Sequence, residues 1–299
     1  MVSYNQEPIK TIAGKSRDIA IFTIHGHNID NEVVKSFGEE WLKFQYFSDE
    51  MIAICAREYF DLVSKDIVNK ESYVLDIGCG TGRWTKYLSS RVNFIEAVDP
   101  SNSIFAADNL LSNIGNVRLT KAGIESIPFN DETFDFVMSI GVLHHTPDPQ
   151  KALIDCVKKV KKGGHFYCYL YHNLESKNLF AKALFWSGEL VRKLVCRLPM
   201  SVKALVCDVL AVVVYMPFIF GVRLLMLLGF KKMALKMPLS AYHNKSFFII
   251  RNDSLDKFGT KLEHRYSKQE IETMMTKAGL QNIIVSDGIP YYHAIGKKL

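Results

Sequence analysis

The sequence has no CxxC cysteine pair, no heptad pattern and no internal repeat with a period of about 20–50 residues. Its six cysteines lie far apart, so we interpret them as buried thiols in a reducing compartment rather than as a zinc or dithiol centre. Only 18 glycines and 9 prolines occur in 299 residues, too few for collagen. These absences leave a globular fold of one large domain or two modest ones.

The excess of one sign of charge over the other is also small. Lys and Arg number 37 against 31 Asp and Glu, a net charge of +6 that is too small to indicate a nucleic-acid-binding protein. The N-terminus has no basic segment followed by an apolar one, so we expect no cleaved secretion signal and a cytoplasmic location.

From residue 71 to 172, β-branched runs alternate with helical stretches. Strands are predicted at Tyr73–Ile77, Phe94–Asp99, Val117–Lys121, Phe134–Ile140 and His165–Tyr171, with helices at about 83–90, 101–111 and 149–161. Gly163 and Gly164 are expected to end the last of these helices. Alternation at this spacing favours a doubly wound, mainly parallel sheet.

The alternation stops at 173–245 and then resumes. Ser267 and Glu270 have the spacing of a capping box, and two further strands are predicted at Gln281–Ser286 and Tyr291–Gly296. The fold class is therefore α/β, with a Rossmann-like, mixed seven-stranded sheet and a helical cap and insertion. Its predicted parts are a helical lead-in (1–70), a core (71–172), an insertion (173–245) and a C-terminal part that completes the sheet (246–299).

The lead-in carries an aromatic stripe. Val33, Val34, Phe37, Trp41 and Phe44 recur at a spacing of three to four residues, as on one face of an amphipathic helix. Core packing is the favoured interpretation of this face, and a lid over a substrate is the alternative.

A glycine-rich turn is the segment that points most directly to a ligand. The strand that ends in Asp76 continues as Ile-Gly-Cys-Gly-Thr-Gly82, a turn that lets a ligand approach bare backbone. It differs from the dinucleotide fingerprint, because Arg83 stands where the third glycine would be. The next strand ends in Asp99, where a carboxylate can accept hydrogen bonds from ribose hydroxyls. The two features together indicate a nucleoside ligand.

These motifs resemble those of the class I S-adenosylmethionine-dependent methyltransferases. The matching segments are Asp76–Gly82, Ala97–Ser101, Ile124–Phe129, Asp131–Val137, Leu143–Asp148 and Val160–Gly164. Ser36–Trp41 and Leu262–Ser267 further resemble a bacterial small-molecule or sugar-type subgroup.

The resemblance implies S-adenosylmethionine as cofactor and S-adenosylhomocysteine as its product. The implied cofactor-binding residues are Asp76, Gly78, Cys79, Gly80, Asp99, Pro100, Ile124, Glu125, Ser139 and Ile140. The backbone of Gly78 and Gly80 would face the cofactor, Asp76 would hold its methionine end, and Asp99 its ribose.

The adenine and methyl ends are implied in the same way. Ile124 would lie against the adenine, and Ser139 and Ile140 nearest the methyl group. Relatives often carry an acidic residue at the place of Gly123, which reads the adenine amino group. Here Glu125 or neighbouring backbone would substitute.

A hydroxyl acceptor needs a base, because its proton leaves during the reaction. The candidate catalytic residues at the carboxyl edge of the sheet are His144, His145, His172 and His264, for each of which a structural role stays open. Tyr169, Tyr171 and Arg265 are predicted to bind the substrate, with a surface salt bridge as the alternative for Arg265.

Several subclasses are disfavoured. Ser139-Ile-Gly-Val142 replaces the Asn/Asp-Pro-Pro-Tyr/Phe signature of amide and base N-methylation, and no basic patch with interleaved aromatics indicates a nucleic acid. No carboxylate cluster of the catechol type is present, so no metal is expected. A small-molecule or sugar-like acceptor is left.

The insertion is both apolar and basic. Residues 175–236 carry seven Lys and three Arg against three acidic residues, and Val209–Val222 holds no charge. A transmembrane helix is disfavoured, since Pro217 and Arg223 interrupt the run and the C-terminal strands must return to the core sheet. A buried lid or dimer interface, and a peripheral membrane contact through 176–240, both stay open.

The leading interpretation is therefore an S-adenosylmethionine-dependent O-methyltransferase acting on a small or sugar-like acceptor. One alternative is a lipid-linked or quinone-like acceptor at the inner membrane face. Another is a non-catalytic cofactor-binding or interaction protein. A homodimer is compatible with each of these.

Overall fold

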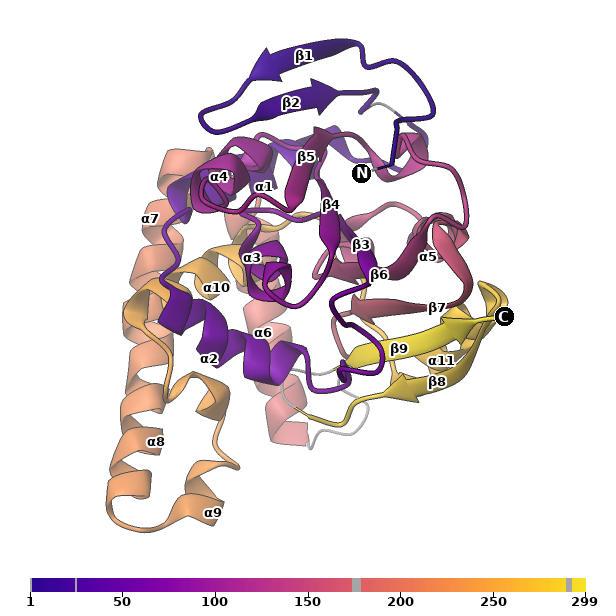
Figure 1. Cartoon of the computed structure of the whole chain (residues 1–299). Coiled ribbons are helices and arrows are strands. Elements are labelled where there is room, and N and C mark those ends of the chain that lie inside the picture. Colours follow the sequence, from indigo (N-terminus) through magenta and orange to yellow (C-terminus); the bar gives the residue numbers. More distant parts are fainter. Residues whose placement is uncertain (1, 25, 174–178, 289–291) are drawn as a thin grey trace. The chain divides into compact units, whose positions relative to one another are not determined.

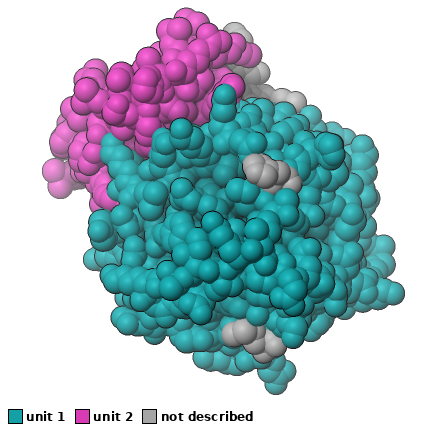
Figure 2. Space-filling view, turned by 90° about the horizontal axis from the view of Figure 1, so that it is seen from above, with its two compact units in different colours: residues 1–173, 262–299 teal, residues 174–261 magenta. Residues whose placement is uncertain are grey.

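The structure, a computed structural model, describes residues 2–24, 26–173, 179–288 and 292–299 (Figure 1). The chain forms two compact units (Figure 2). Unit 1 comprises residues 1–173 and 262–299, and unit 2 comprises residues 174–261. The segment that follows unit 2 thus rejoins the first part of the chain.

Among the described residues, nine strands form one sheet in unit 1. They are β1 (Lys10–Ala13), β2 (Asp18–Ile21), β3 (Tyr73–Ile77), β4 (Phe94–Val98), β5 (Val117–Lys121), β6 (Phe134–Ile140), β7 (Val160–Tyr169), β8 (Leu280–Val285) and β9 (His293–Lys298). Their order is β1-β2-β5-β4-β3-β6-β7-β9-β8. The pairs β1–β2, β7–β9 and β8–β9 are antiparallel, and the other pairs are parallel. The strand order changes direction between β3 and β6, the point at which open α/β sheets bind ligands.

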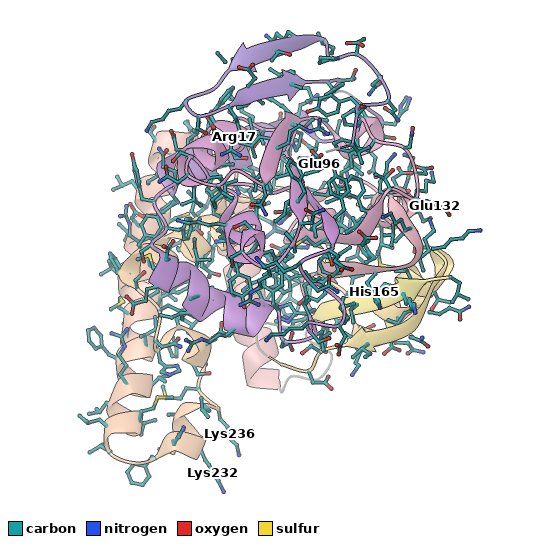
Figure 3. The ribbon with its side chains drawn as sticks, viewed as in Figure 1. Arg17, Glu96, Glu132, His165, Lys232 and Lys236 are labelled. Atoms are coloured by element: carbon teal, nitrogen blue, oxygen red, sulfur yellow. The ribbon has the colours of Figure 1, made fainter. Side chains whose placement is uncertain are left out.

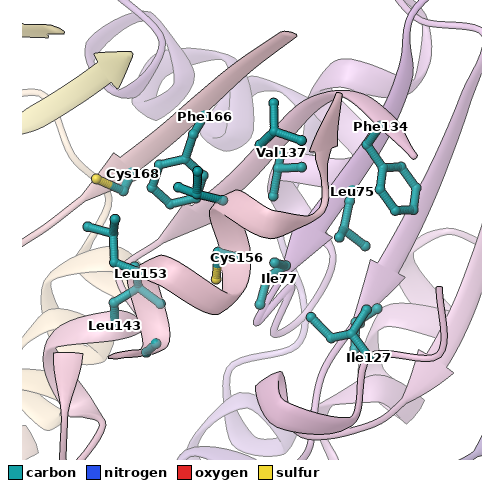
Figure 4. Packing of buried hydrophobic residues seen from close by; sticks show 14 of the residues in the cluster. Leu75, Ile77, Ile127, Phe134, Val137, Leu143, Leu153, Cys156, Phe166 and Cys168 are labelled. Carbon is teal, nitrogen blue, oxygen red and sulfur yellow. The ribbon is translucent and has the colours of Figure 1, made fainter. Parts of the chain in front are cut away.

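Helices cover both faces of this sheet. The helices of unit 1 are α1 (Asn31–Lys43), α2 (Asp49–Tyr59), α3 (Arg83–Ser89), α4 (Ser103–Leu110), α5 (Pro149–Lys158) and α11 (Lys268–Lys277), with short 3₁₀ turns η1 (Ile124–Ser126) and η2 (Leu143–His145). Alternate residues of β3 point to opposite faces: Leu75 and Ile77 join the core under α5 and α11 (Figure 4), and Val74 joins the core under α2, α3 and α4. The capping box at Ser267 and Glu270 is confirmed.

The predicted strands agree closely with the structure. Those at 73–77, 117–121 and 134–140 are confirmed residue for residue. Tyr291, with which the last strand was expected to begin, lies outside the described residues, and β9 is described from His293 onward.

The lead-in differs from the prediction, because it adds two strands to the sheet. β1 and β2 form a hairpin around Gly14 and Arg17, and Ala20 and Ile21 of β2 pair with the edge strand β5. The sheet therefore has nine strands rather than seven. The hairpin was missed because each strand is only four residues long, too short for a clear alternating pattern.

The end of α5 also differs. The helix stops at Lys158, and Gly163 and Gly164 already belong to β7 instead of ending the helix. Gly163 has a φ of 78° and lies next to a register irregularity between β6 and β7. These glycines therefore serve the bulged start of a strand.

Unit 2 is helical and extends further than the predicted insertion, to Lys261. Its elements are α6 (Leu179–Val195), α7 (Met200–Leu210), the π-helical turn η3 (Ala211–Tyr215), α8 (Met216–Leu227), α9 (Lys231–Ala234), the 3₁₀ turn η4 (Ser240–Tyr242) and α10 (Phe247–Gly259). α10 packs on α6 and α7, which is why the unit does not end at 245.

Pro217 was expected to interrupt the apolar run, but the helix continues from Met200 to Leu227. Proline lacks an N–H and would clash with a carbonyl of the preceding turn, and the π-helical turn before it relieves both constraints. Met200–Leu227 is the one helix of the described residues that is long and apolar enough to cross a membrane, and 28% of its most apolar window is buried.

A buried carboxylate fixes the hairpin to the sheet. Asp108 of α4 is 1% exposed and accepts hydrogen bonds from the backbone N–H groups of Lys15 (2.5 Å) and Ser16 (3.2 Å). The Arg17 guanidinium, labelled in Figure 3, lies 3.5 Å away and also donates to the Val117 carbonyl at 2.7 Å.

We expect Asp108→Ala to lower the free energy of unfolding by about 3 kcal/mol, because it leaves buried donors without their acceptor. Amide exchange should accelerate most in residues 10–21. The matched control is Asn109→Ala, an exposed neighbour that should change stability by less than about 0.5 kcal/mol. Unchanged exchange in the hairpin of Asp108→Ala would contradict this account.

Candidate active site

The glycine turn joins β3 to α3 at the carboxyl edge of the sheet. Gly78, Gly80 and Gly82 have φ values of 74°, 56° and 76°, a conformation that disfavours other residues. A Cβ atom on Gly78 would also lie 2.4 Å from the Val142 side chain, and one on Gly82 would lie 2.7 Å from Leu111. The backbone of the turn can therefore be approached closely only because these positions are glycine.

Asp99 follows β4 and binds this turn. Its Oδ2 accepts the Gly80 N–H at 2.9 Å, and its Oδ1 accepts the N–H (2.8 Å) and the hydroxyl (2.7 Å) of Ser101. Asp99 is 6% exposed. Since a carboxylate offers about four lone-pair positions, these bonds leave room at Oδ2 for a ligand hydroxyl.

Asp76, the last polar residue of β3, is 1% exposed and accepts the Thr85 hydroxyl at 2.6 Å. Burial raises the pKa of the Asp76 carboxyl to about 7; the Thr85 hydrogen bond opposes this rise and nearby Asp99 adds to it. A ligand cation beside Asp76 would restore the ionised form.

Helix α1 covers the turn with part of the aromatic stripe. The Trp41 indole lies next to Gly80, where a Cβ atom on that glycine would be 3.4 Å from the indole nitrogen. The Arg83 guanidinium lies 4.7 Å from the rings of both Trp41 and Trp84. Phe44, in contrast, is buried in the core. Phe44 thus confirms core packing at one end of the stripe, and Trp41 lies over the turn at the other; a lid over a substrate stays a prediction.

The other predicted cofactor residues line the same edge in different ways. Cys79 and Ser139 are buried, and the Ser139 hydroxyl donates to the Ile77 carbonyl at 3.1 Å. Ile140 is 8% exposed at the end of β6, whereas Pro100 and Ile124 are half-buried.

Glu125 is already held by the protein. Its carboxylate accepts the Asn28 N–H at 2.9 Å and the Lys151 ammonium at 2.5 Å, and the Lys151 bond lowers the pKa of Glu125. Glu125 thereby ties the segment before α1 to α5. Its expected contact with an adenine amino group stays a prediction.

The turn also has a polar group that suits S-adenosylmethionine. Thr81, between Gly80 and Gly82, is 1% exposed, and its hydroxyl has no hydrogen-bond partner in the part of the chain that the structure describes. A buried polar group of this kind normally finds a partner. An unpartnered hydroxyl in a glycine-rich turn, together with the buried carboxylates Asp76 and Asp99, fits the polar methionine and ribose parts of the cofactor.

His144 lies beyond β6 in η2 and is 0% exposed. Its ring stacks on Tyr171, with centroids 4.0 Å apart, and neither ring nitrogen has a hydrogen-bond partner among the described residues. Burial lowers the pKa of His144 well below 6.5, and the neighbouring His145 adds to the effect. The imidazole is therefore neutral at pH 7.

His145 and His264 lie beside His144. His145 Nδ1 is 2.7 Å from the Leu262 carbonyl, and its ring centroid is 4.8 Å from that of Phe37. The His264 N–H donates to the His144 carbonyl at 2.9 Å. These contacts join η2 to the segment that re-enters unit 1.

Arg265 and His172 belong to the same junction. The Arg265 guanidinium is 2.5 Å from Glu263, 5.3 Å from the Tyr171 ring centroid, and 3.2 Å from the His172 carbonyl. The backbone of His172 forms an isolated β-bridge with that of Tyr266. Among the predicted substrate residues, Tyr171 and Arg265 thus contact each other, and Tyr169 lies 5.7 Å from Tyr171 between ring centroids.

A second histidine environment could not be recognised in the sequence. His293, at the start of β9, is 0% exposed, and its ring lies 5.3 Å from Tyr169 and 5.2 Å from Tyr59. Its Nδ1 is 3.2 Å from Asp61. Burial lowers the pKa of His293, although Asp61 opposes the shift. No local motif marks this pair, because its members are far apart in the sequence and only the return of β9 brings them together.

The fold and the turn define a class of protein. Residues 75–168 match the family model of the methyltransferase domain. The match supports the predicted resemblance to the class I S-adenosylmethionine-dependent methyltransferases over this part of the chain.

Individual relatives are more distant. The chain is 27% identical over 129 residues to a ubiquinone biosynthesis O-methyltransferase of Coxiella burnetii, covering 40% of this chain and 55% of the relative. It is 32% identical over 120 residues to a demethylmenaquinone methyltransferase of a Geobacillus species, covering 36% and 49%. The chain thus spans about half the length of these curated relatives. A methyltransferase structure from Thermotoga maritima is 16% identical, with a TM-score of 0.47 over 87% of this chain and 100% of that one.

The raised pKa of Asp76 predicts a pH dependence of cofactor binding. A cofactor that carries a sulfonium and an ammonium group binds the ionised carboxylate, so binding competes with the proton held at Asp76. We expect the affinity for S-adenosylmethionine to rise about tenfold between pH 6 and pH 8. Calorimetric titration at several pH values measures this rise.

Asp76→Asn is the matched variant, because it keeps the shape and cannot ionise. Its affinity should be weaker and nearly independent of pH over the same range. An equally steep pH dependence in Asp76→Asn would assign the effect to another group.

Proposed function

We propose that this protein transfers a methyl group from S-adenosylmethionine to the hydroxyl oxygen of a small acceptor with a flat, apolar ring, of the quinone-like class. The observation that carries the proposal is the meeting of two environments at one sheet edge. The glycine turn with Asp99 suits the cofactor, and the rings around the ends of β6 and β7 suit such an acceptor.

On this proposal, the residues of the turn hold the cofactor. Asp99 accepts hydrogen bonds from the ribose, Thr81 donates to the carboxylate of the methionine end, and Asp76 pairs with its ammonium group. When bound, S-adenosylmethionine supplies an electrophilic methyl group on a sulfonium. The turn and α1 orient it and exclude water.

Aromatic side chains support the choice of acceptor. The Tyr169 ring lies within 5.1–5.7 Å of Tyr59 and Tyr171, and the Tyr171 ring stacks on His144. A cluster of such rings offers apolar faces and edges of the kind on which a flat apolar acceptor stacks. The curated relatives named for ubiquinone and menaquinone favour the quinone-like class over the sugar-like one, which is the competing candidate.

The proton of the acceptor hydroxyl needs a destination, and His144 is the residue that we propose for it. Its neutral imidazole has one nitrogen that can take up a proton, neither ring nitrogen has a partner among the described residues, and it follows the strand whose end is expected to face the methyl group. His145 and Tyr171 are then positioning residues that hold the His144 ring. His172 and His264 remain candidates with mainly backbone contacts to this group.

Two predictions about partners accompany the proposal. A peripheral membrane contact through 176–240 would bring a lipid-phase acceptor to a cytoplasmic enzyme. A homodimer stays a prediction from the sequence.

The proposal is tested by turnover with S-adenosylmethionine labelled in its methyl group. A hydroxylated quinol with a short isoprenoid tail should become labelled on oxygen, and a glycoside with a free hydroxyl should not. Labelling of the glycoside alone would replace the quinone-like acceptor by the sugar-like one. Failure to bind the cofactor would overturn the proposal as a whole.

His144→Gln should lower kcat about 100-fold, the usual scale of general-base catalysis, while the dissociation constant of S-adenosylmethionine changes less than about twofold. The pH profile of kcat should lose the limb that reports His144 ionisation. His165→Gln, at a half-buried strand position outside the site, is the matched control and should retain full activity. An unchanged kcat in His144→Gln would exclude His144 as the base.

A further inference from the structure

Unit 2 carries an apolar surface that its own helices leave exposed. The helix Met200–Leu227 is apolar on two opposite faces. One face is buried and comprises Ala204, Cys207, Ala211, Tyr215, Ile219 and Val222. The other is 45–84% exposed and comprises Val202, Leu205, Val209, Val212, Val213, Phe220, Leu224 and Leu227, which we call the apolar stripe. A helix that is apolar all round is typical of a protein core or of a membrane environment.

A basic tip continues the stripe. Residues 228–236 turn back through α9 and expose Leu228, Phe230, Met233 and Leu235 at 49–58%, together with Lys231, Lys232 and Lys236. Figure 3 labels Lys232 and Lys236 on this segment. The sequence from 209 to 252 contains no acidic residue at all. The tip is therefore apolar and uniformly positive.

From these observations we infer that the apolar stripe and the basic tip insert into the surface of a membrane with anionic lipids, without crossing it. Apolar side chains combined with lysines on one surface are the pattern of interfacial helices, in which apolar groups enter the acyl boundary and lysines meet lipid phosphates. Large exposed apolar patches otherwise are rare on soluble monomers.

A crossing helix is incompatible with the sheet. Residues on both sides of unit 2 belong to one sheet, since Tyr169 of β7 pairs with His293 of β9. A single span at 200–227 would place these two strands on opposite sides of the bilayer. The helix is also only 28% buried over its most apolar window, so most of that window lies outside the core of unit 2.

A second copy of the chain fits this surface less well. In a symmetric dimer the same patch is buried on both subunits, and residues 209–252 of the second copy offer the tip lysines no acidic partner. Anionic lipid supplies the missing negative charge. The inference rests on the proposed function in one respect, namely that membrane binding would give access to a lipid-phase acceptor. Membrane binding itself needs neither cofactor nor substrate.

Flotation with vesicles tests the inference on the full chain. We expect binding to vesicles that contain phosphatidylglycerol, weaker binding to pure phosphatidylcholine, and release from the anionic vesicles as salt is added. Leu227→Glu/Phe230→Glu should lower partitioning to both vesicle types at least about tenfold. Lys231→Glu/Lys232→Glu should lower it by roughly tenfold or more on the anionic vesicles only.

Ile284→Glu/Lys70→Glu is the matched control, because it makes the same kinds of change at exposed positions of unit 1 and should float like the wild type. All variants should keep the wild-type Tm and affinity for S-adenosylmethionine in solution, which separates lost insertion from lost folding. In Leu227→Trp, tryptophan emission should shift to shorter wavelength when anionic vesicles are added.

Two results would overturn the inference. One is a wild-type chain that stays unbound with both vesicle types at low salt. The other is a wild-type dimer that each of the two double variants dissociates, while neither the wild type nor the variants bind vesicles. In that case a second copy of the chain, rather than a membrane, would cover the apolar stripe. Vesicle binding without methyl transfer would leave the inference intact and overturn the proposed function. Methyl transfer without vesicle binding would overturn the inference and leave the proposed function intact.

Discussion

A carboxylate that is buried next to a sheet edge must find hydrogen-bond donors, and Asp99 finds three of them in the backbone and side chain of two turns. One donor is the N–H of Gly80, whose backbone has a positive φ of 56°. This interaction couples the end of β4 to the turn after β3. The expected cofactor site lies at this junction, directly before the start of α3.

The cover over the cradle follows from the same arrangement. Gly38 of α1 lets that helix approach Ser101 and Asn102, which would lie 3.2–3.3 Å from a Cβ atom at this position, so Trp41 comes to lie beside Gly80. Arg83 then lies between Trp41 and Trp84 and joins the cover to α3. A nucleoside bound at the turn would thus be enclosed by the aromatic stripe that the lead-in sequence already displays.

Local patterns predicted the central sheet well, because each of its buried strands is a short, mostly apolar run, rich in aromatic and β-branched residues, that is followed by a glycine or a polar turn. The turn at Gly78 and Gly80 and the carboxylate Asp99 could be recognised for the same reason. The hairpin β1–β2 could not, since four-residue strands leave little periodicity. The continuity of the helix through Pro217 depends on a π-helical turn that no residue pattern announces.

Long-range contacts limited the prediction of the site. The stacking of His144 on Tyr171 and the anchoring of His145 by Leu262 arise from packing between distant segments. The pair His293–Asp61 exists only after β9 has inserted beside β7. The sequence could therefore name most candidate histidines, but it could not show which of them are buried, paired or next to the expected acceptor.

The central claim is that the glycine turn and Asp99 hold S-adenosylmethionine for methyl transfer at the ends of β6 and β7. A crystal structure of the complex with S-adenosylhomocysteine tests it most directly. The account predicts density with the ribose hydroxyls on Asp99, the methionine end near Asp76 and Thr81, and the sulfur facing Ile140 and Tyr169. An empty turn at a saturating concentration of the ligand, or a ligand bound elsewhere, would contradict it.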